Sequence, residues 1–267
     1  MDARSRLKQC RRVVVKVGTT TLAHENGRMN LRRVERLCWV LAELRHQGKE
    51  VILVSSGAIA VGADRLMLKE RPRDTRGKQA ASAVGQAILM QMYENMFMHY
   101  NQTVAQILLT KDVIDDDTRY ENARNTFSAL LEMGVIPIVN ENDSISTDEL
   151  GFSENDTLSA YVSRLVNSDI LVILSDIDGL YDADPRTFPN AARLSVVEEL
   201  TPELLNAACG SATCLGTGGM AAKLSAARIA AQAGIPTVVA SGENPAILFD
   251  VLEGGEYGTL FVLAAEG

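Results

Sequence analysis

Three stretches of this chain share one pattern, in which a helical segment ends at a glycine and a continuous run of apolar residues follows. They are residues 44–54 (LRHQGKEVILV), 130–139 (LLEMGVIPIV) and 229–239 (IAAQAGIPTVV). Glycine readily adopts the left-handed conformation that ends a helix. A strand that is apolar along its whole length is typical of a parallel sheet, which helices cover on both faces. The pattern therefore predicts an α/β fold.

Further strands and helices alternate along the rest of the chain. Comparable apolar runs occupy residues 12–18, 103–109, 169–176 and 258–264, and apolar residues at helical spacing occupy 31–44, 84–100, 124–134, 155–167 and 219–234. Thr201 precedes Pro202 and Asn244 precedes Pro245, so we expect a helix to begin at each proline. Together these elements predict a three-layer αβα sandwich with a mostly parallel central sheet, formed as a single domain by residues 1–267.

The composition of the chain argues against several classes of protein. Its net charge is -8 at pH 7, whereas nucleic-acid-binding proteins carry a basic surface, so we expect no nucleic-acid partner. No run of about 18 apolar residues occurs, and the first residues lack the apolar core of a secretory signal, so we expect a cytoplasmic protein without membrane association. Cys10, Cys38, Cys209 and Cys214 have no C-x-x-C spacing, so we expect reduced thiols and no metal site.

Polar residues at the ends of the predicted strands mark the expected site, because ligands of such sheets bind beyond the carboxyl ends of the strands. Lys16 lies within a run of valines, where an ammonium group is costly to bury without an anion. Ser56 ends a predicted strand directly before Gly57 and a helix, and backbone N–H groups at a helix N-terminus bind anions. A capped helix without a ligand explains Ser56 equally well.

Polar residues also gather at three later positions in the chain. Residues 140–143 follow a buried strand and indicate substrate contacts, with a solvated loop as the alternative. Asn155 and Asp156 lie where a helix is expected to begin, and capping accounts for only one of them. Ser175 and Asp176 end another strand, but the aspartates that follow do not match a calcium-binding loop, because the glycine stands at the wrong offset.

Residues 215–223 (LGTGGMAAK) form a glycine-rich loop that leads to Lys223. The loop departs from the G-x-x-x-x-G-K-[ST] pattern of a P-loop, so the loop alone does not identify its ligand. Two lysines, a glycine loop, a helix N-terminus and several carboxylates together favour phosphoryl transfer. Its transition state spreads negative charge over phosphate oxygens, which lysines, backbone amides and Mg²⁺ stabilise.

Five motifs occur in order over essentially the whole chain: VVVKVGTTTL, VSSGAIAVG, VNENDSISTDELGFSENDTLSA, LSDIDGLYDADP and LGTGGMAAKLSAA. Together they resemble the motifs of the amino acid kinase superfamily, and in detail those of its glutamate 5-kinase family. The resemblance implies the fold of that superfamily and transfer of phosphate from ATP, with Mg²⁺, to the γ-carboxylate of L-glutamate. The product would be γ-glutamyl phosphate, made in the first step of proline biosynthesis.

The resemblance also implies roles for individual residues. Lys16 and Lys223 would act in catalysis, and Asp156 would orient the two lysines or the metal. The residues implied in binding glutamate are Ser56, Asp143 and Asn155. Those implied in holding the nucleotide are Lys16, Ser175, Asp176, Thr217, Gly218, Gly219, Met220, Ala221, Ala222 and Lys223.

This chain departs from the family pattern at a few points. Ser175 stands where members commonly have threonine, which keeps a hydroxyl group, and Cys214 stands where a small residue is usual. Many bacterial members carry a C-terminal PUA domain, which we expect to be absent from residues 1–267. The resemblance further implies feedback inhibition by L-proline and a homo-oligomer, either a dimer or a tetramer, with the methionine-rich segment 84–100 as a candidate contact.

Three other functions compete with this interpretation. A kinase for N-acetylglutamate would meet no ammonium group on its substrate, whereas Asp143 offers an anion suited to the α-ammonium group of free glutamate. A non-catalytic sensor of amino acids or nucleotides on the same fold could lose either lysine, yet both are present. A dinucleotide-binding oxidoreductase would need G-x-G-x-x-G after the first strand, where this chain has KVGTTT.

Overall fold

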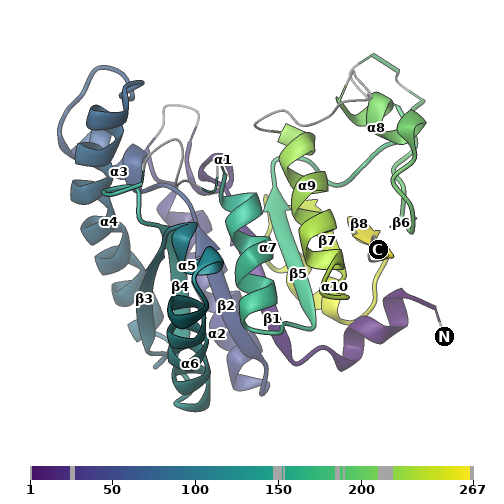
Figure 1. The fold of residues 1–267 in the computed structure, drawn as a ribbon, viewed down its shortest axis with the longest axis horizontal. Coiled ribbons are helices and arrows are strands. Elements are labelled where there is room, and N and C mark those ends of the chain that lie inside the picture. The colour runs from purple at the N-terminus through teal and green to yellow at the C-terminus, as the bar shows by residue number, and fades with distance from the viewer. Residues whose placement is uncertain are drawn as a thin grey trace.

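The computed structural model describes residues 2–24, 28–146, 152, 154–183, 187–188, 190–209 and 219–264, the side chains of 206–209 excepted. These residues form an eight-stranded sheet in the order β3-β4-β2-β1-β5-β7-β8-β6 (Figure 1). The strands are β1 (Arg12–Val17), β2 (Glu50–Ser55), β3 (Val104–Leu109), β4 (Ile136–Glu141), β5 (Ile170–Ser175), β6 (Val196–Val197), β7 (Thr237–Ser241) and β8 (Thr259–Phe261). Neighbouring strands are parallel except for β7 and β8, so the predicted mostly parallel sheet is confirmed.

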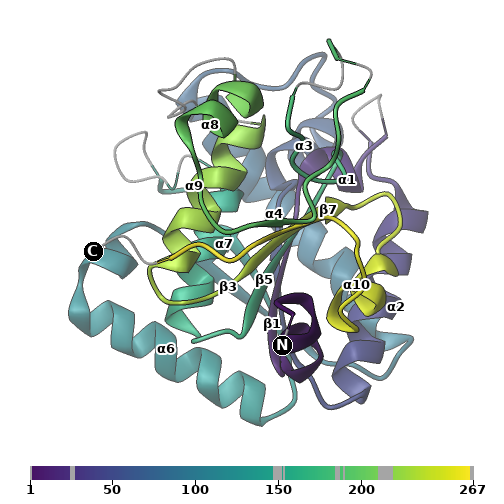
Figure 2. The same ribbon diagram turned by 90° about the vertical axis from the view of Figure 1, so that its right-hand side faces the viewer.

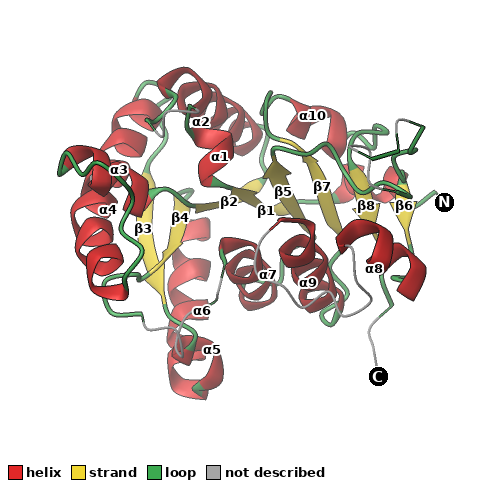
Figure 3. Ribbon diagram, turned by 90° about the horizontal axis from the view of Figure 1, so that it is seen from above, coloured by secondary structure: helices red, strands yellow, loops and turns green. Residues whose placement is uncertain are grey.

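Helices cover both faces of this sheet and complete the three layers (Figure 3). On one face lie the 3-10 helix η1 (Arg4–Gln9), α2 (Leu31–His46), α4 (Thr75–Met98) and α10 (Ile247–Leu252). On the other lie α6 (Asp117–Glu132), α7 (Asn155–Leu165) and α9 (Gly219–Ala231). The shorter helices are α1 (Thr19–Leu22), α3 (Ala58–Arg65), α5 (Asp112–Asp115) and α8 (Pro202–Cys209). The predicted αβα sandwich is therefore confirmed.

The central strand β1 places its side chains alternately in the two layers. Val13, Val15 and Val17 belong to the core beneath α2 and α10. Val14 belongs to the core beneath α7 and α9. Because side chains along a strand alternate between its faces, Lys16 points to the same side as Val14. This alternation brings the Lys16 ammonium group to the helices that follow β4 and precede β7.

The topology also fixes where a ligand binds. The chain leaves β1 for β2 on one side, and after β4 it crosses to β5 on the other side of β1. In an open parallel sheet, the crevice beyond the carboxyl ends at such a reversal is the usual ligand site. The carboxyl ends of β1, β2, β4 and β5 all meet at this edge, where the first residues of α3, α7 and α9 also lie.

Helix starts follow the sequence only in part. Helix α8 begins at Pro202 as predicted, and the N–H of Leu204 donates to Thr201 Oγ1. The prediction at Asn244 is wrong, because α10 begins at Ile247. The Asn244 carboxamide oxygen instead accepts from the N–H of Ala246, so the asparagine and proline shape a turn ahead of the helix.

The methionine-rich helix is longer than predicted. It begins at Thr75, where Asp74 caps it by accepting from the N–H of Gly77. Met90, Met92 and Met96 pack against the core, whereas Met98 is exposed. Among the helices that the structure describes, none combines the length and the apolar character needed to cross a membrane.

Candidate functional site

Two lysines that are far apart in sequence meet at one carboxylate. Lys16 Nζ lies 2.5 Å from Asp156 Oδ1, and Lys223 Nζ lies 3.2 Å from Asp156 Oδ2. Lys16 comes from β1, Asp156 from the first turn of α7 and Lys223 from the start of α9. All three side chains are buried, with 8%, 2% and 7% of the residue exposed for Lys16, Asp156 and Lys223. The structure thus brings together the three residues expected to act in catalysis.

Among the three side chains in contact, Lys16, Asp156 and Lys223, positive charge exceeds negative charge. One carboxylate faces two ammonium groups, and burial makes an uncompensated charge costly. The N-termini of α7 and α9, which add partial positive charge, lie at the same place. Lys223 Nζ also donates to the carbonyl oxygen of Gly219, which ties the lysine to the first turn of its helix. The cluster is therefore built to receive an anion such as a phosphate group.

A pocket of about 310 Å³ lies beyond the carboxyl ends of β2 and β4. The three residues expected to bind substrate, Ser56, Asp143 and Asn155, all line it. Asn155 directly precedes Asp156, so the pocket adjoins the lysine cluster. Two exposed cations, Arg71 and Lys78, stand at its rim. The pocket therefore offers both signs of charge next to the buried lysines.

Hydrogen bonds connect Asn155 to its neighbours in the pocket wall. Asn155 Nδ2 donates to Ser56 Oγ at 2.8 Å and to Asn140 Oδ1 at 2.9 Å. Asn140 Nδ2 donates to Gln86 Oε1 at 2.9 Å. The expectation that capping explains Asn155 or Asp156 is wrong. Glu154 is the N-cap residue of α7 and makes no side-chain capping bond, and both side chains point to the site instead.

Two buried polar residues behind this wall were not predicted from the sequence. Gln86 and Tyr93 both lie on α4, in a segment whose apolar spacing predicted only core packing. The hydroxyl group of Tyr93 lies 2.7 Å from Ser55 Oγ, at the end of β2. A polar residue on the buried face of a helix was the available clue, since such groups are retained only with a partner.

Asp143 is held by α4 across the pocket. Ser82 Oγ donates to Asp143 Oδ2 at 2.9 Å. Burial raises the pKa of the Asp143 carboxyl, and repulsion from Glu141 raises it further, while the Ser82 hydrogen bond and the positive charge of Lys78 act against this. Asp143 is thus a partly desolvated carboxylate that gains from a cationic partner.

The residues expected to hold the nucleotide lie at the same edge of the sheet. Ser175 ends β5, and its Oγ donates to Asp176 Oδ1 at 2.9 Å. The residues Gly219, Met220, Ala221 and Ala222 form the first turn of α9, with Lys223 next. Thr217 and Gly218 lie outside the described residues. A triphosphate at the N-terminus of α9 would therefore reach the Lys223 ammonium group and, across Asp156, that of Lys16.

The described residues contain no group of three His, Cys, Asp or Glu side chains placed to hold a metal ion. Mg²⁺ in proteins keeps several waters and binds through substrate phosphates with one or two carboxylates. Glu154, whose pKa is raised by burial and by the nearby Asp156 charge, lies beside the lysine cluster, and Asp176 lies at the end of β5.

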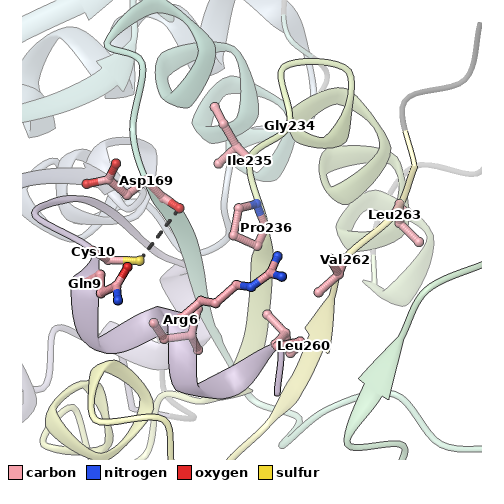
Figure 4. A pocket seen from close by; sticks show the side chains of 12 residues that line it. Arg6, Gln9, Cys10, Asp169, Gly234, Ile235, Pro236, Leu260, Val262 and Leu263 are labelled. Atoms are coloured by element: carbon pink, nitrogen blue, oxygen red, sulfur yellow. Dashed lines mark hydrogen bonds between the residues drawn. The ribbon is translucent and has the colours of Figure 1, made fainter. Parts of the chain in front are cut away.

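A second cavity, of about 410 Å³, lies at the opposite ends of the strands, around the residues that precede β1, β5 and β7 (Figure 4). Its carboxylate, Asp169, accepts from the N–H groups of Arg11 and Arg12. Its thiol, Cys10, has a pKa raised by burial to about 11 and is a free cysteine. Both groups are engaged within the fold, since Cys10 Sγ also lies 3.8 Å from the carbonyl oxygen of Asp169, and the pocket at the carboxyl ends is the candidate functional site.

Comparisons with known proteins agree with this geometry. The model of the amino acid kinase family matches residues 11–241. A glutamate 5-kinase of Clostridium perfringens is 53% identical over 263 residues, covering 97% of this chain and 98% of the relative. A glutamate 5-kinase of Clostridium tetani is 50% identical, covering 96% of each. Among solved structures, a UMP kinase from Bacillus anthracis shares the fold at a TM-score of 0.64, with 18% identity and 97% coverage of both chains.

Proposed function

This chain belongs to the amino acid kinase family, and we propose that it is a glutamate 5-kinase, which transfers the γ-phosphoryl group of ATP to the γ-carboxylate of L-glutamate. The product is γ-glutamyl phosphate, made in the first step of proline biosynthesis. One observation carries the proposal beyond the family: Asp156 draws two buried lysines together beside a pocket that contains Asp143. That combination supplies positive charge for a phosphoryl group and negative charge for an amino acid.

Catalysis rests on position and charge. An oxygen of the γ-carboxylate forms a bond to the γ-phosphorus, while the bond from this phosphorus to the bridging oxygen breaks and ADP leaves with its electrons. The Lys16 and Lys223 ammonium groups stabilise the charge on the transferred group, and Asp156 keeps both lysines in place before the substrates arrive. The γ-carboxylate is already ionised at neutral pH, so the reaction needs no general base.

ATP binds with its phosphates at the N-terminus of α9. The first turn of α9, from Gly219 to Lys223, offers backbone N–H groups to the phosphates, and Ser175 and Asp176 contact the nucleotide. For Thr217 and Gly218, which lie outside the described residues, the family resemblance implies a part in binding the nucleotide. Bound Mg²⁺ would supply charge neutralisation at the phosphates. The nearby carboxylates of Glu154 and Asp176 are the described residues that suit its hydration shell.

L-Glutamate occupies the pocket of about 310 Å³. Its α-ammonium group pairs with Asp143, its α-carboxylate faces the rim cations Arg71 and Lys78, and Ser56 and Asn155 hold it toward the lysines. An N-acetylated substrate has no ammonium group, so it would leave the Asp143 charge in the pocket without a partner. Free glutamate is for this reason preferred to N-acetylglutamate.

A hydroxamate assay tests the proposal. The protein is incubated with ATP, Mg²⁺ and hydroxylamine, which traps an acyl phosphate, and with either L-glutamate, N-acetyl-L-glutamate or L-aspartate. We expect hydroxamate with L-glutamate and little with the other two. Binding of glutamate and ATP without hydroxamate would favour a non-catalytic sensor, and hydroxamate mainly from N-acetylglutamate would overturn the choice of substrate.

The family resemblance extends the proposal to regulation and assembly. We propose that L-proline inhibits by competing at the glutamate pocket, since it also carries a cationic amino group for Asp143 and a carboxylate for the rim cations. We further propose a cytoplasmic homo-oligomer, a dimer or a tetramer, built from kinase domains of this fold. Glutamate-competitive inhibition kinetics and sedimentation of the purified protein test these two points.

A further inference from the structure

A backbone N–H group determines how the side-chain amides in the pocket wall are oriented. The N–H of Glu141 can only donate, and it lies 2.9 Å from the atom of the Asn140 side chain that must therefore be Oδ1. The same oxygen lies 2.9 Å from Asn155, which must then present Nδ2. Asn140 Nδ2 is left facing Gln86, which must present Oε1. One fixed donor thus sets the polarity of three amides.

With the three amides oriented in this way, Asn155 has only its carboxamide oxygen left for a ligand. The two hydrogens of Asn155 Nδ2 are taken up by Ser56 Oγ and Asn140 Oδ1. Within the part of the chain that the structure describes, Asn155 Oδ1 accepts no hydrogen bond, and Asn155 lines the pocket. Asn155 can therefore offer the pocket an acceptor only. L-Glutamate at neutral pH carries a single group that donates hydrogen bonds, its α-ammonium group.

We propose that Gln86 is a positioning residue for substrate recognition: through Asn140 it holds Asn155 with its carboxamide oxygen toward the α-ammonium group of the acceptor substrate. Gln86 does not belong to the pocket lining and is buried on α4. It acts only through the two asparagines. The inference rests on the proposed function, because the amino group that Asn155 recognises is that of glutamate.

Removal of the Gln86 acceptor disturbs the whole chain of amides. Asn140 is buried, and Gln86 Oε1 is the acceptor that the described residues give its Nδ2. A buried donor without a partner is unfavourable, so Asn140 would turn toward water or another acceptor. Its Oδ1 would then leave Asn155, whose amide would be free to rotate and present Nδ2 to the substrate. An Nδ2 group in that place repels an ammonium group.

A double-mutant cycle of Gln86→Met and Asn155→Ala tests this inference. Gln86→Met keeps the size of the side chain and removes the acceptor, and we expect the KM for L-glutamate to rise about tenfold with the KM for ATP unchanged. In the Asn155→Ala background, the same substitution should have little further effect. Gln86→Glu restores an acceptor oxygen and should bring the KM back to within about threefold of the original protein.

Two matched measurements separate positioning from general damage. Gln91→Met makes the same substitution on the exposed side of α4 and should leave both KM values unchanged. Glutarate, which has both carboxylates but no amino group, should inhibit the Gln86→Met variant as well as it inhibits the original protein. If Gln86→Met unfolds, Gln86→Asn, whose shorter side chain withdraws the acceptor from Asn140, replaces it in the same cycle.

The inference is wrong if the effects of the two substitutions multiply, if Gln86→Glu fails to restore the KM, or if glutarate binding weakens as much as glutamate binding. Failure of the proposed function looks different. In that case the protein without any substitution gives no hydroxamate from L-glutamate, and there is no KM for L-glutamate to compare among the variants. If the original protein forms hydroxamate and the effects of the two substitutions on the KM multiply, only the role of Gln86 is rejected and the proposed function stands.

Discussion

At the scale of single residues, Asp156 links the two halves of the proposed phosphate site. Its carboxylate contacts Lys16 from β1 and Lys223 from α9, and it is itself almost completely buried. Each ammonium group retains hydrogens that Asp156 does not use, and these can donate to phosphate oxygens. The lysines are thus positioned before ATP binds, which is the condition for electrostatic stabilisation of a transition state.

Lys16→Met and Lys223→Met should each lower kcat by about 10²–10³, because each removes one preorganised cation from the transferred phosphoryl group. Initial rates of ADP formation with saturating L-glutamate and ATP measure this. Lys49→Met is a suitable control. Lys49 donates to the carbonyl oxygen of Cys10, which precedes β1, whereas Lys16 lies near the carboxyl end of that strand. A fall in the kcat of the Lys49→Met control as large as in the two other variants would contradict the assigned roles.

The raised pKa of Asp143 predicts an acid limb in the pH profile of kcat/KM for L-glutamate. Only the ionised carboxylate pairs with an ammonium group, so kcat/KM should fall as the pH drops through this pKa. Because burial raises it, the fall should begin above the ordinary aspartate value of 3.8. Asp143→Asn should have a lower kcat/KM throughout and should lack this limb, and a profile that Asp143→Asn leaves unchanged would rule out the pairing.

The sequence identified these residues because of where they stand. Lys16 lies near the end of a predicted strand, and Asp156 and Lys223 lie near the starts of predicted helices, so all three were expected at the edge of the sheet where ligands bind. Their catalytic roles were implied by the family resemblance. Gln86 and Tyr93 were beyond such reasoning, since they lie in the middle of α4 and their partners are set by how that helix packs. The role of Glu154 as the N-cap of α7, without a capping bond, was equally hidden.

At the scale of elements, α3 and α4 pack closely enough for their backbones to touch. A Cβ atom on Gly85 would overlap the carbonyl oxygen of Ala58, and one on Gly62 would overlap that of Ala81. Helix α3 begins directly after Ser56 and Gly57, which line the pocket proposed to bind glutamate. This contact therefore sets the position of one pocket wall against α4, which carries Gln86 and Ser82.

Gly85→Ala should lower the free energy of unfolding by about 1–3 kcal/mol, although alanine favours a helix more than glycine does. The added methyl group pushes α3 away from α4, so the KM for L-glutamate should also rise. Chemical denaturation and steady-state kinetics measure the two effects. Ala87→Ser, on the exposed side of α4, is the control, and a Gly85→Ala variant more stable than the original would contradict the close packing.

Elements were predictable where the local pattern and the packing agree. The buried strands and the amphipathic helices came from apolar spacing, and the sheet order followed only once the structure placed the strands. The start of α10 was misplaced because an asparagine before a proline suits a turn as well as a helix N-terminus. The early start of α4 was not predicted because its first residues, Thr75 to Lys78, include no apolar side chain that would mark a buried helix face.

At the scale of the whole molecule, one arginine ties the two ends of the chain together, where Figure 2 shows η1 near the sheet. Arg4 is buried and donates to the carbonyl oxygens of Gly255, Ser195 and Gly258 at 2.6, 2.7 and 2.8 Å. These carbonyls belong to the loops around β6 and β8, and none of their residues lines the pocket of Asp143 or takes part in the ion pairs of Lys16, Asp156 and Lys223. The hydrogen bonds of Arg4 thus stabilise the fold without contacting the candidate site.

Arg4→Met should lower the free energy of unfolding by about 3 kcal/mol, because it leaves buried carbonyl oxygens without donors. In a protein of this size, each kcal/mol shifts the melting temperature by about 2–4 °C. Arg6→Met, on the exposed side of η1, is the matched control and should change the melting temperature little. A kcat for glutamate phosphorylation that falls along with stability at low temperature would contradict a purely structural role.

The central claim is that the two lysines held by Asp156 act on one phosphoryl group. Its most direct test is a structure of the protein with L-glutamate, Mg²⁺ and a non-hydrolysable ATP analogue. The account predicts that Lys16 Nζ and Lys223 Nζ both lie within about 3.2 Å of oxygens of the same γ-phosphate, with the γ-carboxylate of glutamate facing its phosphorus. A γ-phosphate bound away from either lysine, or glutamate bound outside the pocket of Asp143, would contradict it.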